Sequence, residues 1–291
     1  MLPGIIVLAG AMMMSDVAAL RDSINARIMA SPGAIVAVSY HDLETGESLG
    51  INADSTFHAA STMKVPVMME VLRQSQAGAF SLDQGILLVN QFSSIADGSS
   101  YALDAGSDSD TALYSRVGTR VTVRDLMQRM ITRSSNLATN QLIALTGAAN
   151  VNALARSLGA RRIQVLRGVE DQKAFDRGMN NTTTSGDLAV LLLAIERGQV
   201  LSPASSAEMR EILLAQELNE KIPAGLPAGT RVAHKTGEIT AVSHDAGIVY
   251  PEGRKPYVIV VLTRGLRESR ASSALIADIS RLIYAHATAR R

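Results

Sequence analysis

The chain has 291 residues, of which 47% are hydrophobic, so it is long enough for one large domain or for two packed lobes. Its 28 Lys and Arg residues against 27 Asp and Glu residues give a net charge of +1, and no long basic stripe is present, which argues against a nucleic-acid partner. The absence of cysteine excludes disulfides, thiolate metal sites and a cysteine nucleophile.

The first fifteen residues form an apolar segment that is too short to cross a bilayer but long enough for the hydrophobic region of a signal peptide. The small residues Ala9, Gly10 and Ala11 suit a cleavage site, although the usual cationic residues before the apolar region are missing. A disordered apolar tail is the alternative. We expect export, and therefore a periplasmic or secreted monomer without a membrane span once the segment is removed.

The next elements are a helix and a pair of strands. Apolar residues recur at helical spacing over 16–29, and Ser31-Pro32-Gly33 then ends the helix. A β-branched apolar segment at 34–40 and a second one at 48–51 are separated by a turn, which predicts two paired strands.

The middle of the chain is predicted to be helical. Segments with an apolar face or a helical composition lie at 61–76, 123–132, 137–145, 150–158 and 184–196. Between them, the Ser, Asp and Gly-rich stretch 96–111 predicts a loop.

Strands return near the end of the chain. The segments 229–236, 241–250 and 257–263 suit an antiparallel meander with a break at Gly237-Glu238, and a helix over 269–287 follows. This order predicts an α+β fold, in which an antiparallel sheet with flanking terminal helices is built from both ends of the chain and an all-helical lobe is inserted. The predicted division is a signal-like segment 1–15, a discontinuous α/β lobe 16–60 and 205–291, and a helical lobe 61–204.

Ser61 and Lys64 open one of the predicted helices, and their spacing places both on one face about one turn apart. Unpaired N–H groups at a helix start can stabilise an oxyanion, and a serine hydroxyl becomes a nucleophile when a neighbouring base takes its proton. Lys64 can be that base if its pKa is lowered. Alone, the pair is better explained by structure, as an N-cap serine followed by an exposed lysine.

Two further groups of polar residues follow along the chain. Ser134-Ser135-Asn136 lies between two predicted helices, where it can cap a helix, or relay a proton through Ser134 and offer the Asn136 amide to a substrate. Lys235-Thr236-Gly237 ends a predicted strand, where it can form a plain turn or hold a substrate carboxylate with a cation, a hydroxyl and a free strand edge. Lys235 near Lys64 would also lower the pKa of Lys64.

The ordered set of S-x-x-K, S-x-N and K-T-G motifs resembles that of class A β-lactamases and serine penicillin-binding proteins. The likeness extends from about residue 16 to the end of the chain. It implies acylation of Ser61 by a β-lactam or a D-alanyl peptide, with proton transfer through Lys64 and Ser134 and an oxyanion hole from the N–H groups of Ser61 and Glu238. It also implies that Asn136 orients the substrate amide, that Lys235, Thr236 and Gly237 bind the substrate at the strand edge, and that neither a cofactor nor a metal is needed.

The resemblance also implies a glutamate that activates the water for deacylation, and Glu170 is the candidate. It follows Arg167 and precedes Asn181, but Ala174 stands where the family has a water-holding asparagine, and the loop is somewhat short. A solvated loop carboxylate is the alternative for Glu170.

Other departures from the family pattern concern binding. Ser135 replaces the usual aspartate, Glu238 stands where a small residue is usual and could repel an anionic substrate, and His234 resembles penicillin-binding proteins more. The arginine that would anchor the substrate carboxylate is not assigned, and the candidates are Arg264, Arg267 and Arg270. None of the five histidines pairs at a metal-ligand spacing, so we expect ordinary core or surface residues.

The leading hypothesis is a class A β-lactamase-like hydrolase. A D-alanyl-D-alanine peptidase-like enzyme with slow deacylation is the second hypothesis, and a β-lactam-binding sensor that stays acylated is the third.

Overall fold

The structure is a computed structural model that describes residues 4–289, with side chains from Val17 onward. The signal-like segment 1–15 therefore lies outside the described side chains, and its role stays a prediction. Among the described residues, no helix combines the length and the apolar character needed to cross a membrane.

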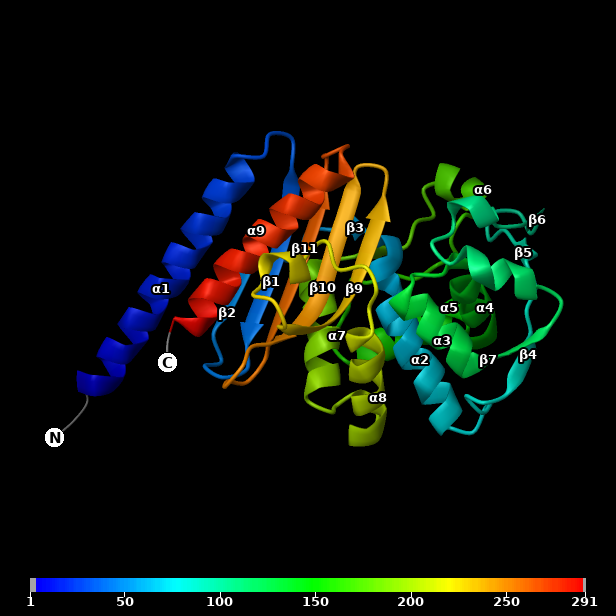
Figure 1. The fold of residues 1–291 in the computed structure, drawn as a ribbon, viewed down its shortest axis with the longest axis horizontal. Helices are drawn as coiled ribbons and strands as arrows, with labels where there is room; N and C mark the ends of the chain where they lie inside the picture. Colours follow the sequence, from blue (N-terminus) through cyan, green and yellow to red (C-terminus); the bar gives the residue numbers. More distant parts are fainter. Residues whose placement is uncertain (1–3, 290–291) are drawn as a thin grey trace.

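A five-stranded antiparallel sheet forms the centre of the described chain. Across the sheet the order is β2 (Ser48–Ile51), β1 (Ile35–Asp42), β11 (Tyr257–Arg264), β10 (Val242–Tyr250) and β9 (Arg231–Ile239). Strands from both ends of the chain thus share one sheet, which confirms the predicted α+β class. β9 is an edge strand, and its free edge faces the helical lobe (Figure 1).

The predicted break at Gly237-Glu238 is wrong, because β9 continues to Ile239. Gly237 lies opposite His244 and Glu238 opposite Ser243 in the antiparallel register, and the chain turns only at Thr240-Ala241. A glycine is tolerated here because another backbone segment approaches it closely, as described below.

Both faces of the sheet are buried, because successive residues of a strand point to opposite faces. In β11, Ile259 and Val261 belong to one hydrophobic core, whereas Val258 and Val260 belong to another. The continuous apolar sequence of this strand reflects burial on both sides.

The two terminal helices cover one face of the sheet. They are α1 (Gly4–Met29) and α9 (Ser269–Thr288), which lie side by side in Figure 1. Arg27 Nε donates a hydrogen bond of 2.6 Å to Asp278 Oδ2 and so joins the two helices.

The other face carries α7 (Ser185–Glu196). The predicted boundary at residue 204 assigned this helix to the helical lobe, but Leu188 and Leu191 pack into the same core as the strand residues, and Ser39 Oγ donates a 2.9 Å hydrogen bond to Ser185 Oγ. The helix that follows, α8 (Pro203–Leu214), contacts β9. It was not predicted from the sequence, although a capping residue at Ser202 and a proline at the first helical position are typical of a helix start.

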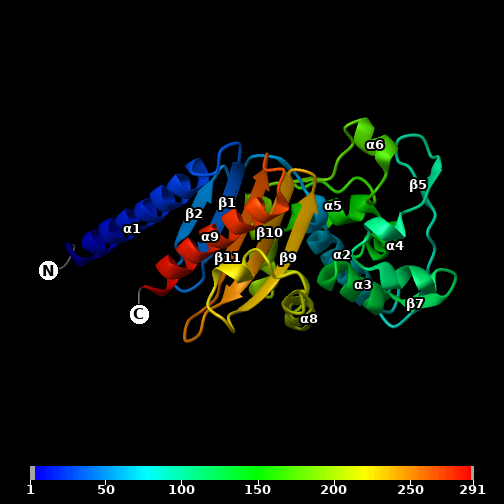
Figure 2. The same ribbon diagram turned by 45° about the horizontal axis from the view of Figure 1, so that its top comes forward.

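The helical lobe stands beside the free edge of β9 (Figure 2). Its longer helices are α2 (Lys64–Gln76), α3 (Val123–Thr132), α4 (Asn136–Thr146) and α5 (Ala148–Ser157). These match the predicted segments to within about three residues. All residues of α2 from Lys64 to Leu72 are buried, so this helix is the core of the lobe.

Short elements complete the lobe and its connections. They are β3 (Phe57–His58) paired with β8 (Thr182–Thr183), β4 (Gly85–Leu87) paired with β7 (Arg120–Thr122), β5 (Phe92–Ser93) paired with β6 (Ser100–Tyr101), the helix α6 (Gln172–Asp176), and the 3₁₀ turns η1 (Ala60–Met63), η2 (Ala105–Ser107), η3 (Thr111–Arg116) and η4 (Pro223–Gly225). The predicted loop 96–111 therefore contains only a two-residue strand and 3₁₀ turns.

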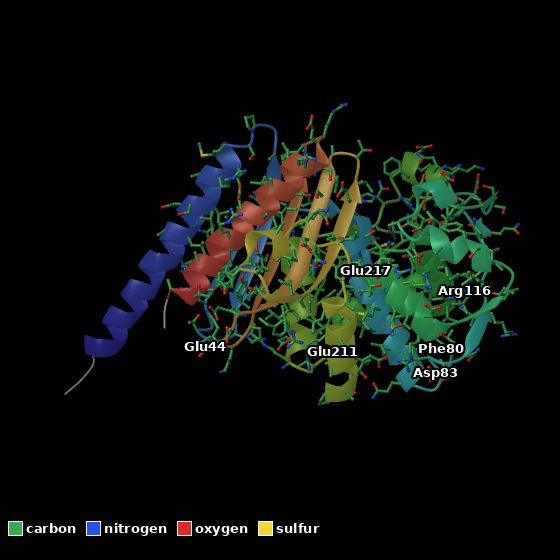
Figure 3. The ribbon with its side chains drawn as sticks, in the orientation of Figure 1. Glu44, Phe80, Asp83, Arg116, Glu211 and Glu217 are labelled. Atoms are coloured by element: carbon green, nitrogen blue, oxygen red, sulfur yellow. The ribbon has the colours of Figure 1, made fainter. Side chains whose placement is uncertain are left out.

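The two lobes are joined where the chain leaves α8. Figure 3 shows Glu217 at this junction, between the sheet and the helical lobe. Glu217 N donates to Thr132 O at 3.0 Å, and Arg133 Nε donates to Glu217 Oε1 at 3.0 Å. These contacts hold the end of α3, and with it the adjoining Ser134 loop, against the α/β lobe.

Candidate active site

Ser61 lies in the 3₁₀ turn η1, just before α2, rather than in the first turn of the α-helix as predicted. Ala60 before it has a positive φ of 45°, a strained conformation for a residue with a side chain. A Cβ on Gly237 would lie only 3.1 Å from Ser61 N, so β9 can approach the serine this closely only with glycine at that position.

Lys64 is the first residue of α2, and its side chain is completely buried. Its Nζ donates hydrogen bonds to Ser134 O at 2.7 Å, Ser134 Oγ at 3.0 Å and Asn136 Oδ1 at 3.1 Å. All three donors of the ammonium are thus used, and two of the predicted motifs meet at one atom.

Burial lowers the pKa of Lys64 to about 7, although the negative charges of Asp108 and Glu170 oppose the shift. Repulsion by Lys235, which the sequence predicts as a further cause, is therefore not the main one. Near neutrality a substantial share of Lys64 is the free amine, which can accept a proton from a neighbouring hydroxyl.

Ser134, Ser135 and Asn136 form the entrance to α4. Ser134 has a positive φ of 58°, which turns both its carbonyl and its hydroxyl oxygen toward Lys64. Ser135 Oγ accepts from Ala138 N, so it is the helix cap, while Asn136 Nδ2 donates to Glu170 Oε1 at 3.0 Å. The capping interpretation and the chemical one thus apply to different residues of the same motif.

Lys235 and Thr236 lie on β9 beside Ser61, and the Lys235 ammonium is fully buried. Burial, and then repulsion by the Lys64 ammonium, hold the pKa of Lys235 well below its usual value. Lys235 Nζ donates a 2.9 Å hydrogen bond to Thr236 O, within β9. Lys235, Thr236 and Gly237 do not line the cleft of Ser61, so the structure places this motif beside the serine but not at the surface of the cleft.

Glu238 follows on β9, and its carboxylate does not stand free at the substrate side. Lys221 Nζ, which is almost completely buried, donates to Glu238 Oε2 at 3.0 Å and to Glu220 Oε1 at 2.9 Å. The predicted repulsion of an anionic substrate is therefore reduced by this pairing. Lys221 also adds positive charge near Lys235.

Of the arginines considered as carboxylate anchors, Arg264 packs its guanidinium over the Phe57 ring, 5.1 Å from the ring centroid, two strands away from β9. Arg270 is exposed on α9, where it lines a groove together with Glu220. Lys221 is a buried cation that acts on Lys235.

Glu170 lies in a loop that runs from Arg167 to Asn181. Its Oε1 accepts from Asn136 Nδ2, and its Oε2 accepts from Asp104 N at 3.3 Å, so the half-buried carboxylate is tied to Asn136, which is also an acceptor for Lys64. Its positive φ of 62° marks a constrained backbone. Ala174 is fully buried and offers no polar group for a water.

The ends of this loop are fixed by polar contacts. Asn181 Oδ1 accepts from Leu166 N at 2.8 Å and Arg167 N at 3.1 Å, and Asn181 Nδ2 donates to Arg167 O. The Arg167 guanidinium donates in turn to Met179 O at 3.0 Å. A hydrogen-bonded amide thus closes the base of the loop.

Ser61, Asn136, Glu170 and Glu238 line one cleft of about 410 Å³. His58, which the sequence analysis treated as an ordinary core or surface residue, lines it as well. Its Nδ1 accepts from Ala60 N at 3.0 Å, and its buried Nε2 has no hydrogen-bond partner among the described residues. The sequence gives no signal for this placement, because it depends on the path of the chain before Ser61.

The site combines a serine in a cleft with a buried lysine of lowered pKa and a second buried lysine on the adjoining strand. This combination is that of a serine acyl-transfer hydrolase. Comparison with known proteins agrees. The family model described as "Beta-lactamase enzyme family" matches residues 19–287, so the chain belongs to the β-lactamase enzyme family. The predicted resemblance is confirmed.

Similar proteins include Beta-lactamase AST-1 of Nocardia asteroides, 31% identical over 270 residues that cover 91% of this chain and 83% of the relative. Among solved structures, a β-lactamase from Sphaerobacter thermophilus DSM 20745 matches with a TM-score of 0.79 and 27% identity, over 92% of this chain and 98% of that one. The protein titled PBP-A matches with a TM-score of 0.79 and 29% identity, over 91% and 94%.

Proposed function

We propose that this β-lactamase-family enzyme hydrolyses β-lactams in two steps, by acyl transfer to Ser61 Oγ and then to water. The observation that carries the proposal is the buried Lys64 side chain, which lies one turn from Ser61 and is bound to both Ser134 and Asn136, of which Asn136 lines the same cleft as Ser61. A base of lowered pKa is what a serine nucleophile needs.

In the acylation step, neutral Lys64 takes the Ser61 hydroxyl proton while Oγ attacks the lactam carbonyl carbon. The Ser61 and Glu238 N–H groups stabilise the oxyanion, since β9 presents its free edge within contact of Ser61. The C–N bond of the lactam then breaks, and Ser134 passes a proton from Lys64 to the leaving nitrogen.

Substrate binding involves the other residues of the motifs. Lys235 and Thr236 bind the substrate carboxylate, because a desolvated ammonium and a hydroxyl form charge-assisted hydrogen bonds with it. Asn136 donates its amide to the substrate side chain, and Gly237 allows the strand edge to lie against the substrate. In the second step Glu170 takes a proton from the water that attacks the ester carbon, and Ser61 is regenerated.

The test of this function is hydrolysis of a chromogenic cephalosporin by the purified chain, followed together with intact mass. We expect catalytic turnover and a serine adduct. Absence of both hydrolysis and adduct would contradict the proposal.

A second candidate, a D-alanyl-D-alanine peptidase-like enzyme with slow deacylation, is favoured by one observation. Buried Ala174 provides no polar side chain to hold a water near Glu170, and the Glu170 carboxylate already accepts two hydrogen bonds. An adduct that persists for many minutes, with release of D-alanine from a D-alanyl peptide, would support this candidate over the first.

Acylation should depend on pH through Lys64. Because burial lowers the pKa of Lys64 to about 7 and the base must be neutral, kcat/KM should rise between about pH 6 and about pH 8, with a midpoint near 7. Stopped-flow measurement of acylation over this range checks the prediction. A rate that is flat down to about pH 5 would show that Lys64 is not the base.

Lys235→Ala should weaken substrate binding and slow acylation together, because the carboxylate loses its desolvated cation. The loss expected for one buried charged hydrogen bond is about 10- to 100-fold in kcat/KM. Steady-state kinetics with benzylpenicillin measure it, and Lys255→Ala in an exposed turn is the control. Unchanged kcat/KM would leave Lys235 a strand-end residue only.

We also propose that the protein is periplasmic or secreted and works as a monomer. The apolar segment 1–15 supports export, and fractionation of cells that express the full chain tests it. Sizing of the purified protein tests the monomer.

A further inference from the structure

Asp108 is a buried carboxylate beside the active site to which no motif points. It lies between η2 and η3 and is 5% exposed. Its Oδ2 accepts from Asn136 N at 2.9 Å, Leu137 N at 3.0 Å and the Tyr114 hydroxyl at 3.0 Å, and its Oδ1 accepts from Asp110 N at 3.0 Å. Every contact is a donor, so this arrangement fits the ionised carboxylate.

Two of these donors are the first N–H groups of α4, which have no partner inside the helix. Ser135 Oγ accepts from the next N–H group of the helix, that of Ala138. Asp108 thus completes the cap from a segment 28 residues away in the sequence and fixes the backbone at Asn136.

The loop that Asp108 fixes is strained. Ser134 has a φ of 58°, and its carbonyl and hydroxyl both accept from Lys64 Nζ. A non-glycine residue in this conformation persists only if its surroundings hold it, and charge-assisted hydrogen bonds are strong enough to do so. Movement of the Asn136 backbone would therefore displace the three Lys64 acceptors on Ser134 and Asn136.

The charge of Asp108 is also unusual. The neighbouring buried carboxylate, Asp110, forms ion pairs with Arg129 and Arg133. In the described part of the chain no lysine, arginine or histidine forms an ion pair with Asp108. A buried carboxylate held by neutral donors alone keeps its electrostatic effect on the surroundings, because no counter-ion cancels it.

We propose that Asp108 is a positioning residue for acylation, which holds the Ser134–Asn136 loop against Lys64 and supplies part of the negative charge that Lys64 experiences. This inference rests on Lys64 as the acylation base. Asp108 does not touch the substrate cleft, so it acts through Ser134, Asn136 and Lys64.

Three charged groups act on Lys64. Asp108 and Glu170 are negative, whereas Lys235 has the same sign of charge as Lys64 and repels it. Burial lowers the pKa of Lys64, and Asp108, followed by Glu170, raises it against that effect. Removal of the Asp108 charge should therefore lower the pKa of Lys64 further.

The experiment compares Asp108→Asn with the parent in the pH profile of acylation by benzylpenicillin. The asparagine side chain keeps one oxygen that can accept from Asn136 N and Leu137 N. It has no charge, and its NH₂ group replaces the oxygen that accepts from Asp110 N. We expect the plateau rate to fall at least about tenfold through loss of positioning and the acid limb to move to lower pH, by on the order of one unit. Tyr114→Phe removes one donor and keeps the charge, so its acid limb should stay in place.

The result that would overturn the proposal is a plateau within about twofold of the parent, or a lower plateau with the acid limb unmoved, as a merely structural role predicts. If Asp108→Asn does not fold, Asp108→Glu carries the test. It keeps the charge and displaces the hydrogen bonds, so a lower plateau with an unmoved limb supports the positioning role, and the parent rate overturns it. The pH profile of the parent separates this failure from failure of the Lys64 mechanism, because an acid limb with a midpoint near pH 7 supports Lys64 as the base and a flat profile does not.

Discussion

Ser61→Ala is expected to abolish both β-lactam turnover and the covalent adduct. Ser61 lines the cleft at the point where β9 comes closest to η1, and the Ser134 and Asn136 contacts of Lys64 do not involve its hydroxyl, so the site should remain folded around alanine. Loss of the nucleophile in a serine hydrolase costs up to about a millionfold in rate. Hydrolysis of a chromogenic cephalosporin and labelling with a fluorescent penicillin measure the two losses.

The matched control is Ser75→Ala, near the other end of α2. It should keep both turnover and labelling. If Ser61→Ala still labelled with penicillin, the nucleophile would be another residue and the assignment of the whole cleft would be wrong.

Glu170→Gln is expected to convert a transient acyl-enzyme into one that accumulates. Glutamine keeps an oxygen that can accept from Asn136 Nδ2 but carries no charge. Acylation should therefore continue, while the general base that activates the water is lost. General-base help is worth about 10²–10⁴-fold, and deacylation should slow by that factor. A burst of product followed by a slow steady state, seen by stopped flow, is the signature.

The control for this change is Asp176→Asn, at the end of α6 in the same loop, where the carboxylate only accepts a hydrogen bond from Gln172 at the surface. It should show parent kinetics. If Glu170→Gln hydrolysed as fast as the parent, Glu170 would be only a loop carboxylate, and the peptidase-like candidate would lead.

The sequence was sufficient to locate the centre of the site because its chemistry is carried by short motifs. Ser61 and Lys64 are one turn apart, and Lys235, Thr236 and Gly237 are consecutive on one strand, so the spacing within each motif is set locally, whereas the fold brings β9 beside η1. The sheet and the terminal helices were likewise predictable from apolar spacing.

The parts that could not be predicted depend on contacts between distant segments. Asp108 reaches Asn136 and Leu137 across 28 and 29 residues, and Lys221 reaches Glu238 across 17, and no local pattern indicates either pairing. A single buried aspartate in a polar loop is indistinguishable in sequence from its exposed neighbours. Its role appears only when the fold places it at the start of α4.

The end of β9 shows how a local rule can fail. A glycine followed by a glutamate is typical of a strand end, but here the strand continues through Gly237 to Ile239. The glycine is required by the approach of Ser61 N, and Glu238 is tolerated because Lys221 pairs with it.

The measurement that tests the account most directly is time-resolved intact mass of the parent enzyme after mixing with benzylpenicillin, with peptide mapping of the adduct. The proposed mechanism predicts one adduct that has the full mass of the penicillin, lies on Ser61, and disappears as the substrate is consumed. Substrate consumption without any adduct at the earliest resolvable times, or an adduct on another residue, would contradict it.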